Sequence, residues 1–152
     1  MTGMRTPMNS QRGVAAVELA LVLPVLIALL TLPVFFGIYF MHHTVVQKAA
    51  QSAARYMSTV RKTEIRSPML AAAATDAAKG VARETLADYN LAQGASIDID
   101  CDTWECLGGN ALPTHVRVMV TYRIRDDIFG LINTGDYGWA VKAQVTMKYA
   151  GQ

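Results

Sequence analysis

The chain has 152 residues, of which 52% are hydrophobic, and its formal net charge at pH 7 is +2. This length suits about one domain and, once a membrane segment is set aside, leaves no room for a large core. After residue 42 basic and acidic residues are intermixed, whereas a nucleic-acid-binding surface needs basic residues clustered on one face, so we expect no nucleic-acid partner.

A long apolar run follows a short motif near the N-terminus. The motif Arg12–Glu18 reads Arg-Gly-Val-Ala-Ala-Val-Glu, and Leu19–Met41 contains no charged residue. A helix of that length rises about 35 Å, enough to cross a hydrocarbon core of about 30 Å. A cleaved secretory signal is the alternative, but its apolar region spans only about 7–15 residues and ends in a small-x-small site. Residues 37–43 lack such a site, which favours a retained anchor.

Three residues of this region have physical consequences. Glu18 is a single carboxylate at the apolar edge of the span, where an acid usually has a partner or a function. It could reach the lipid headgroups by snorkelling, or it could pair with a cation. Pro24 and Pro33 lie inside the span. Each removes a helix donor, so the sequence predicts two kinks.

Two helices are predicted between the span and Gly94. Over 44–62 the apolar residues recur at alternating steps of four and three, which predicts one helix that continues from the span; they are Val46, Ala50, Ala53, Met57 and Val60. Ser67-Pro68 can begin a second helix over about 68–90. Its predicted apolar stripe is Leu70, Ala74, Ala77, Val81, Leu86 and Tyr89.

After Gly94 the apolar period changes to two, which is typical of half-buried strands. Three strands are predicted, over 95–102, 116–125 and 139–149. A turn at 108–110 joins the first two, and a loop at 126–138, with the apolar stretch Ile128–Ile132, joins the last two. The predicted fold class is therefore α+β: an N-terminal transmembrane helix extended into a long helix, a second helix, and a three-stranded antiparallel sheet.

The two cysteines, Cys101 and Cys106, are five positions apart. Such a pair in a small exported domain favours one disulfide. Half a zinc site is the alternative, but His115 alone does not complete the ligand set. We therefore expect no metal at this pair, and we expect the C-terminal part to lie in an oxidising compartment.

The remaining polar residues do not predict an enzyme. The densest acidic cluster is similar to a calcium loop but lacks its turn glycine and terminal glutamate, so we expect a solvated strand face; it consists of Asp98, Asp100, Asp102 and Glu105. His42, His43 and His115 accompany no nucleophile elbow and no phosphate-binding loop. We expect no catalytic residues, no cofactor and no small-molecule substrate.

The motif Arg12–Glu18, the apolar span, the alanine-rich segment Gln47–Tyr56 and the strand-rich C-terminus together resemble TadE-like proteins. These are the TadE/TadF group of minor pseudopilins of the Tad, or Flp, pilus. The specific part of the resemblance runs from Arg12 to Tyr56. One departure is Leu19, where the family often has phenylalanine.

The resemblance implies processing by a prepilin peptidase, with the cut between Gly13 and Val14. Glu18 would then be the fifth residue of the mature chain and would pair with the free amine of a neighbouring subunit. We accordingly expect three parts: a cytoplasmic leader at 1–13, a transmembrane helix at 14–41 and an exported domain at 42–152.

The resemblance also implies partners and a location. The partners are the membrane, the peptidase, other pilins or pseudopilins and the Tad inner-membrane platform. The chain would lie in the inner (cytoplasmic) membrane as a single-pass protein, with its N-terminus in the cytoplasm and its C-terminal domain in the periplasm, and it could enter the pilus. The alternative is a single-pass anchored binding or sensor domain that never assembles, which needs neither Gly13 nor Glu18.

Overall fold

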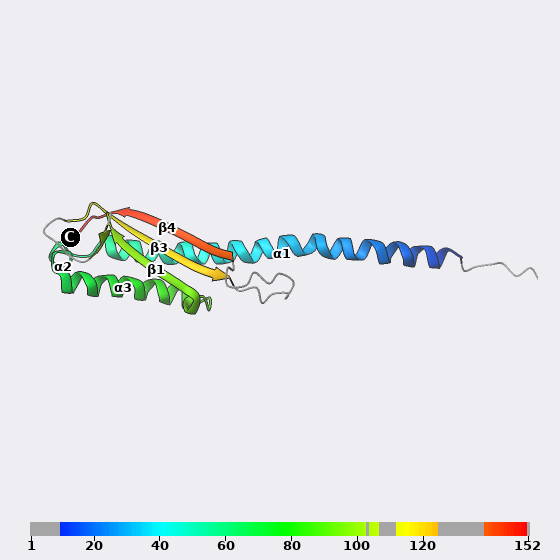
Figure 1. Cartoon of the computed structure of the whole chain (residues 1–152), viewed down its shortest axis with the longest axis horizontal. Helices are drawn as coiled ribbons and strands as arrows, with labels where there is room; N and C mark the ends of the chain where they lie inside the picture. Colours follow the sequence, from blue (N-terminus) through cyan, green and yellow to red (C-terminus); the bar gives the residue numbers. More distant parts are fainter. Residues whose placement is uncertain (1–9, 103, 107–111, 125–138, 152) are drawn as a thin grey trace, which may run out of the picture. The chain divides into compact units, whose positions relative to one another are not determined.

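The computed structural model describes residues 10–102, 104–106, 112–124 and 139–151. The described elements are three α-helices, a short 3-10 helix and four strands, which confirms the predicted α+β class with its N-terminal apolar helix and antiparallel sheet (Figure 1). The turn predicted at 108–110 and the loop at 126–138 lie outside the described residues. The chain divides into two compact units, Met1–Tyr39 and Phe40–Gln152, and each is described by itself.

The first helix, α1, covers Ser10–Ser58 and continues through both of its prolines. The stripe predicted at its C-terminal end is confirmed, because all five of its members are buried. The buried face is wider than the predicted stripe, since it also includes Val45, Ala49 and Ala54. Helix α1 ends four residues before the predicted position, and a separate one-turn helix, α2 (Lys62–Arg66), follows it.

The third helix, α3 (Pro68–Ala87), begins as predicted, with Pro68 in its first turn. Ser67 occupies the N-cap position, but its side chain makes no capping hydrogen bond. The predicted apolar stripe is confirmed at Ala74 and Leu86 but is wrong elsewhere, because Val81 is only half-buried and the other three members are exposed: Leu70, Ala77 and Tyr89. The buried stripe instead consists of Ala71, Ala74, Ala78, Ala82 and Leu86. Since α3 is rich in alanine, two neighbouring stripes fit its sequence. The stripe of smaller side chains is the buried one, because it lets the helix pack closer to its neighbours.

The four strands are β1 (Ala95–Cys101), β2 (Trp104–Glu105), β3 (His115–Ile124) and β4 (Trp139–Lys148). They form one antiparallel sheet in the order β2-β1-β3-β4. The three long strands are those predicted; β2 was missed because a two-residue strand has no measurable period. Figure 1 shows α3 beside β1, with β4 at the opposite margin of the sheet.

One face of the sheet forms the core together with the helices of the second unit. Alternate residues of the long strands lie on this face, as the alternation predicted, and many of them are buried; the fully buried valines are Val116, Val118, Val120 and Val141. Ile97 and Ile99 of β1 extend the same face. Among the described residues, Met57 of α1 and Leu86 of α3 are the largest fully buried side chains. The buried residues of β1 and β3 all follow this alternation, so the strand register is set by the apolar face.

The residues after β4 return to the end of α1. The N–H groups of Ala150 and Gly151 both donate to the carbonyl of Ser58, at 3.0 and 3.2 Å. The Tyr149 hydroxyl donates to the carbonyl of Val60 at 2.7 Å. Burial, and then the negative charge of Glu64, raise the pKa of Tyr149, so the phenol stays a donor at neutral pH. The C-terminal residues therefore satisfy carbonyl groups that the end of a helix leaves without partners.

Candidate functional site

The predicted processing site lies in the first turn of α1. The helix begins at Ser10, so the bond between Gly13 and Val14 is only one turn from its end. The first N–H groups of a helix have no partner within the helix, and helix ends fray readily. A peptidase would therefore need to open little regular structure to reach this bond.

The fold gives no reason for a glycine at position 13. A Cβ atom built there meets no heavy atom within 4 Å, and the backbone is ordinary helix. Alanine would be more favourable in a helix by about 1 kcal/mol. Within the described chain, neither close packing nor a left-handed backbone accounts for Gly13.

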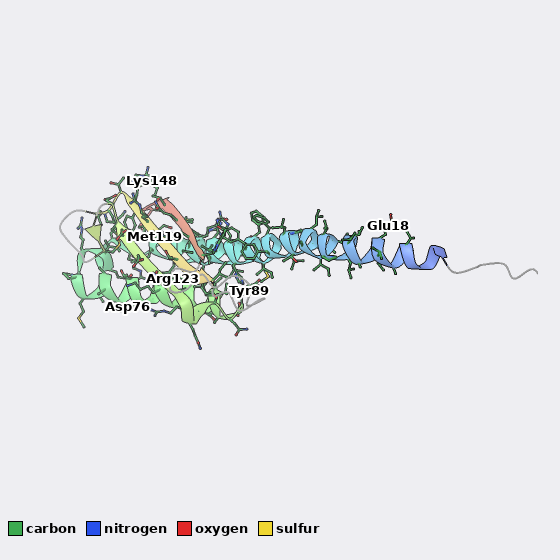
Figure 2. The ribbon with its side chains drawn as sticks, turned by 45° about the vertical axis from the view of Figure 1, so that its right-hand side comes forward. Glu18, Asp76, Tyr89, Met119, Arg123 and Lys148 are labelled. Atoms are coloured by element: carbon green, nitrogen blue, oxygen red, sulfur yellow. A yellow bond between two sulfur atoms is a disulfide. The ribbon has the colours of Figure 1, made fainter. Side chains whose placement is uncertain are left out.

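Glu18 lies one helical turn after Val14. Residues four apart share one side of a helix and are separated by about 6 Å along its axis. Glu18 is exposed, and it makes no hydrogen bond or ion pair with any residue that the structure describes. Its neighbours Val17 and Leu19 are aliphatic and more than 60% exposed. Figure 2 shows Glu18 pointing away from the helix, toward no other side chain.

The apolar stretch that follows Glu18 is likewise exposed within the described chain. This helix is long and apolar enough to cross a membrane once, and within the described chain none of its most apolar window is buried. Leu21, for example, is 72% exposed. Thr31 keeps its hydroxyl satisfied by donating to the carbonyl of Ile27 at 2.8 Å. A large exposed apolar surface of this kind indicates contact with lipid or with other apolar helices.

In the second unit, the structure joins Cys101 to Cys106 by a disulfide, with the two Cα atoms 5.0 Å apart. The bond links the end of β1 to the residue after β2. The pair thus fixes the hairpin that extends the sheet beyond β1. The disulfide predicted from the sequence is therefore present, and no free thiol remains among the described residues.

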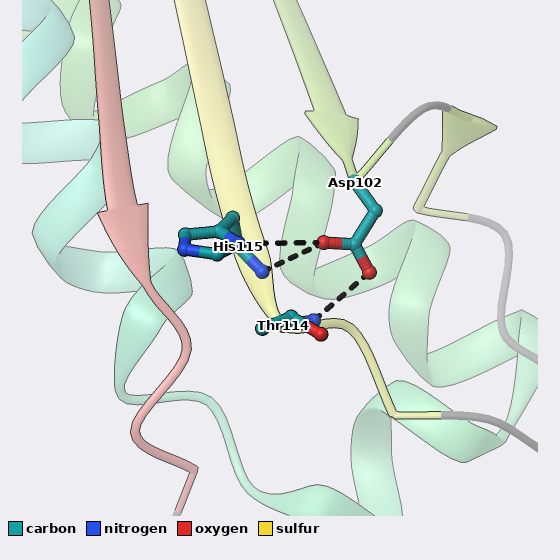
Figure 3. A network of polar contacts seen from close by, with 3 residues as sticks. All are labelled: Asp102, Thr114 and His115. Atoms are coloured by element: carbon teal, nitrogen blue, oxygen red, sulfur yellow. Dashed lines mark hydrogen bonds and ion pairs between the residues drawn. The ribbon is translucent and has the colours of Figure 1, made fainter.

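Asp102 is not on the acidic strand face where the sequence placed it. Strand β1 ends at Cys101, and Asp102 has a left-handed backbone with φ of 57°. Its carboxylate accepts hydrogen bonds from the backbone N–H groups of Thr114, at 2.9 Å, and His115, at 2.8 Å (Figure 3). Its own N–H donates to the carbonyl of His115 at 2.9 Å. Aspartate tolerates this backbone and commonly caps such turns, a role that the alternating pattern did not reveal.

These contacts give Asp102 a defined pH dependence. The hydrogen bonds from Thr114 and then His115 lower the pKa of the Asp102 carboxyl. A lowered pKa in the folded chain stabilises the fold above the ordinary carboxyl value of about 3.9, and this stabilisation is lost as the pH falls through the lowered value. The His115 ring lies 3.8 Å from the same carboxylate and is exposed.

We expect Asp102→Ala to speed hydrogen exchange of the Thr114 and His115 amides about five- to tenfold at neutral pH, because each loses an acceptor. Asp102→Asn is the matched control, since asparagine also adopts the left-handed backbone but has a single acceptor oxygen. It should give an intermediate rate. The difference between the wild type and Asp102→Ala should shrink to about that of Asp102→Asn once the carboxyl is protonated, because the protonated group keeps one carbonyl acceptor. Equal exchange rates at neutral pH would show that the carboxylate does not hold these amides.

The acidic cluster does not form a cation site within the described chain. Asp98 and Asp100 lie on β1, whereas Asp102 caps the following turn. Among the described side chains, no group of three or more His, Cys, Asp or Glu residues could hold a metal ion. Asp98 and Asp100 instead line an open pocket with Asp76 and Lys79 of α3, about 260 Å³ in volume.

Two of the histidines make structural contacts within the described chain. His42 packs its ring edge against Tyr122 of β3, with centroids 5.6 Å apart, and burial lowers its pKa. His115 begins β3 and faces Asp102. Of the described contacts, none joins either ring to a serine, threonine or cysteine nucleophile. These contacts are structural: one covers Tyr122, and the other belongs to the turn after β1.

Residues 13–55 match the family model described as TadE-like protein. The match covers the proposed cut, Glu18, the apolar span and the alanine-rich part of α1, but not the sheet. No curated protein and no solved structure matches the chain. The TadE-like family is a structural family associated with the Tad pilus, and the match confirms the resemblance drawn from Arg12–Tyr56. Over residues 13–55, this chain is therefore similar to TadE-like proteins.

Proposed function

We propose that the chain is a minor pseudopilin of a Tad-type pilus or secretion apparatus, trimmed by a prepilin peptidase between Gly13 and Val14. The observation that carries this proposal is Glu18: an acid with no partner in the described chain, at the edge of an uncovered apolar helix, one turn after a glycine that the fold does not require. An ordinary membrane anchor needs neither residue.

Trimming would supply the partner that Glu18 lacks. The cut creates a new α-amino group on Val14. This cation would come level with Glu18 of a neighbouring subunit when the two helices pack side by side with an axial offset of about one turn. A carboxylate at the edge of the membrane costs less free energy when a cation lies beside it. The pairing is therefore available only to the trimmed chain, which makes assembly depend on processing.

The proposed location follows from the same arrangement. The leader at 1–13 would lie in the cytoplasm, residues 14–41 would cross the inner membrane, and residues 42–152 would lie in the periplasm, where the Cys101–Cys106 bond can form. The exposed apolar surface of the span would contact other pilins or pseudopilins and the Tad platform within the membrane. The role is structural: priming, capping or otherwise supporting assembly and adhesion.

The competing function is an anchored sensor or binding domain that never assembles. The two functions differ in what they require of the span, because a sensor needs only an anchor whereas a pseudopilin needs this particular helix. Exchange of residues 13–41 for an unrelated leucine–alanine span separates them. We expect the exchanged chain to insert in the membrane but to leave a deletion strain without surface pili. Restored pili would show that the segment is only an anchor and would contradict the proposal.

A further inference from the structure

The free margin of the sheet is the long strand β4. In the described chain β4 pairs only with β3, over all ten of its residues and without a bulge. Figure 1 shows it at the margin of the sheet opposite β1. Sheet margins of this length are templates for pairing with another chain, and proteins usually shorten, bulge or cover them. Within the described residues β4 shows none of these three features.

The register shows which backbone groups lie on this margin. Tyr149, directly after β4, donates its N–H to the carbonyl of Thr114, directly before β3, at 2.9 Å. In an antiparallel pair, alternate residues direct both backbone groups to the partner strand and the residues between them direct both away. The N–H and C=O groups of five residues therefore point to the open side: Ala140, Lys142, Gln144, Thr146 and Lys148. They have no partner among the described residues.

The side chains around this margin have a definite chemistry. The five outward-directed residues are all exposed, and two of them, Lys142 and Lys148, stand about 20 Å apart along the strand on one face. Arg117 and Arg123 of β3 lie on the same face, one strand further in. On the opposite, apolar face, Val145 and Met147 are only half-buried. Over β3 and β4, one face is thus basic, and the other has apolar surface that the described chain does not fully cover.

Strand β1 shows what pairs with such a surface in this fold. Its sequence alternates isoleucine with aspartate, and it lies antiparallel to β3 with Asp100 opposite Arg117. Its isoleucines join the core while its aspartates stay on the basic face. A strand of the same alternation on the free side of β4 would cover Val145 and Met147, place acids beside Lys142 and Lys148, and satisfy five outward N–H and C=O pairs.

We propose that β4 is a docking site for an extended segment of another protein in which aliphatic residues alternate with aspartate or glutamate, added antiparallel as a further strand. Backbone hydrogen bonds would supply affinity, and the lysines and the apolar face would set the choice of partner. The proposal is separate from trimming and assembly through the span, because no residue of β4 takes part in either.

The test uses the purified full chain in detergent micelles and a fluorescein-labelled peptide of about ten residues in which isoleucine alternates with aspartate. Fluorescence anisotropy measures its binding. We expect saturable binding that weakens as salt rises. A peptide of equal composition with all aspartates at one end, and a peptide with lysine in place of aspartate, should bind at least about tenfold more weakly.

Gln144→Pro is the most direct variant. It removes an N–H that points to the open side, where proline is tolerated, and it leaves the bonds to β3 in place. We expect loss of peptide binding, while Gln144→Ala, which keeps the N–H, should bind as the wild type does. Thermal melting checks that both variants are folded. The double variant Lys142→Glu, Lys148→Glu leaves the backbone donors and acceptors unchanged. It should bind the lysine peptide more tightly than the aspartate peptide, the reverse of the wild type.

Three results would overturn the proposal. The first is the absence of saturable binding by the wild type up to roughly 1 mM peptide, which would leave the lysines as residues that merely protect the margin. The second is equal binding by Gln144→Pro, which would place the peptide elsewhere. The third is self-association of the full chain that Gln144→Pro abolishes while no peptide binds, which would make a second copy the occupant.

Discussion

Replacing Gly13 with arginine is expected to leave the chain untrimmed in cells that contain the prepilin peptidase. The proposed peptidase would need a small residue before the cut, and arginine places a long charged side chain there. A further basic residue on the cytoplasmic side agrees with the orientation preference of membrane spans, so insertion should be unaffected. The untrimmed chain keeps residues 1–13, which a denaturing gel detects as slower migration, and it should fail to restore surface pili in a deletion strain.

Gly13→Ala is the matched control for this prediction. A Cβ atom at this position meets no neighbouring heavy atom, and alanine is the better helix former by about 1 kcal/mol. The folded chain should therefore tolerate it, and we expect trimming to remain nearly complete. Complete trimming of Gly13→Arg at the same bond would contradict the assignment of the cut. Loss of trimming in both variants would show instead that the peptidase requires glycine itself.

Replacing Glu18 with alanine is expected to leave insertion and trimming intact and to reduce surface pili at least about tenfold. Removal of a carboxylate makes a membrane span easier to insert. The amine of Val14 on a neighbouring subunit would then be left without a partner in the apolar edge of the membrane. Removing one partner of a desolvated pair costs more free energy than the 1.4 kcal/mol that corresponds to about a tenfold change in an equilibrium constant. Membrane fractionation measures insertion, and electron microscopy counts the pili.

Two controls separate the position of the acid from its charge. Glu18→Asp keeps the carboxylate and should retain part of the assembly. The double variant Glu18→Ala, Ala16→Glu keeps a carboxylate at nearly the same depth but moves it to almost the opposite side of the helix, because successive residues turn by about 100°. We expect it to remain defective. Normal pili with Glu18→Ala would contradict the pairing of Glu18 with the amine. Normal pili with the double variant would show that assembly needs a carboxylate near this depth but not at position 18.

Most of the fold could be predicted because its signals are periodic. The apolar run defines the N-terminal part of α1, and the alternation in β1, β3 and β4 gives both the strands and their buried face. The stripe of α3 could not be assigned in the same way. With alanine at most candidate positions, hydrophobicity does not distinguish Ala77 from Ala78, and only packing against the sheet decides which of them is buried.

The contacts missed from the sequence are those made between distant residues. Asp102 continues the alternation of β1 and so was read as a strand residue, although its side chain serves the N–H groups of Thr114 and His115. The bond from Tyr149 to Val60 joins residues 89 positions apart, and no local pattern encodes it. The residues of the proposed processing and assembly site differ from these: Gly13 and Glu18 form a local motif that the sequence alone predicted, and the fold adds no contact to it within the described chain.

The mass of the N-terminal peptide of the wild-type chain tests the central claim most directly. The chain would be isolated from membranes of cells with the prepilin peptidase and of otherwise identical cells without it. With the peptidase we predict that the mature chain begins at Val14, and without it that the chain retains residues 1–13. A chain that keeps Gly13 in the presence of an active peptidase, or one that begins at Val14 in its absence, would contradict the account.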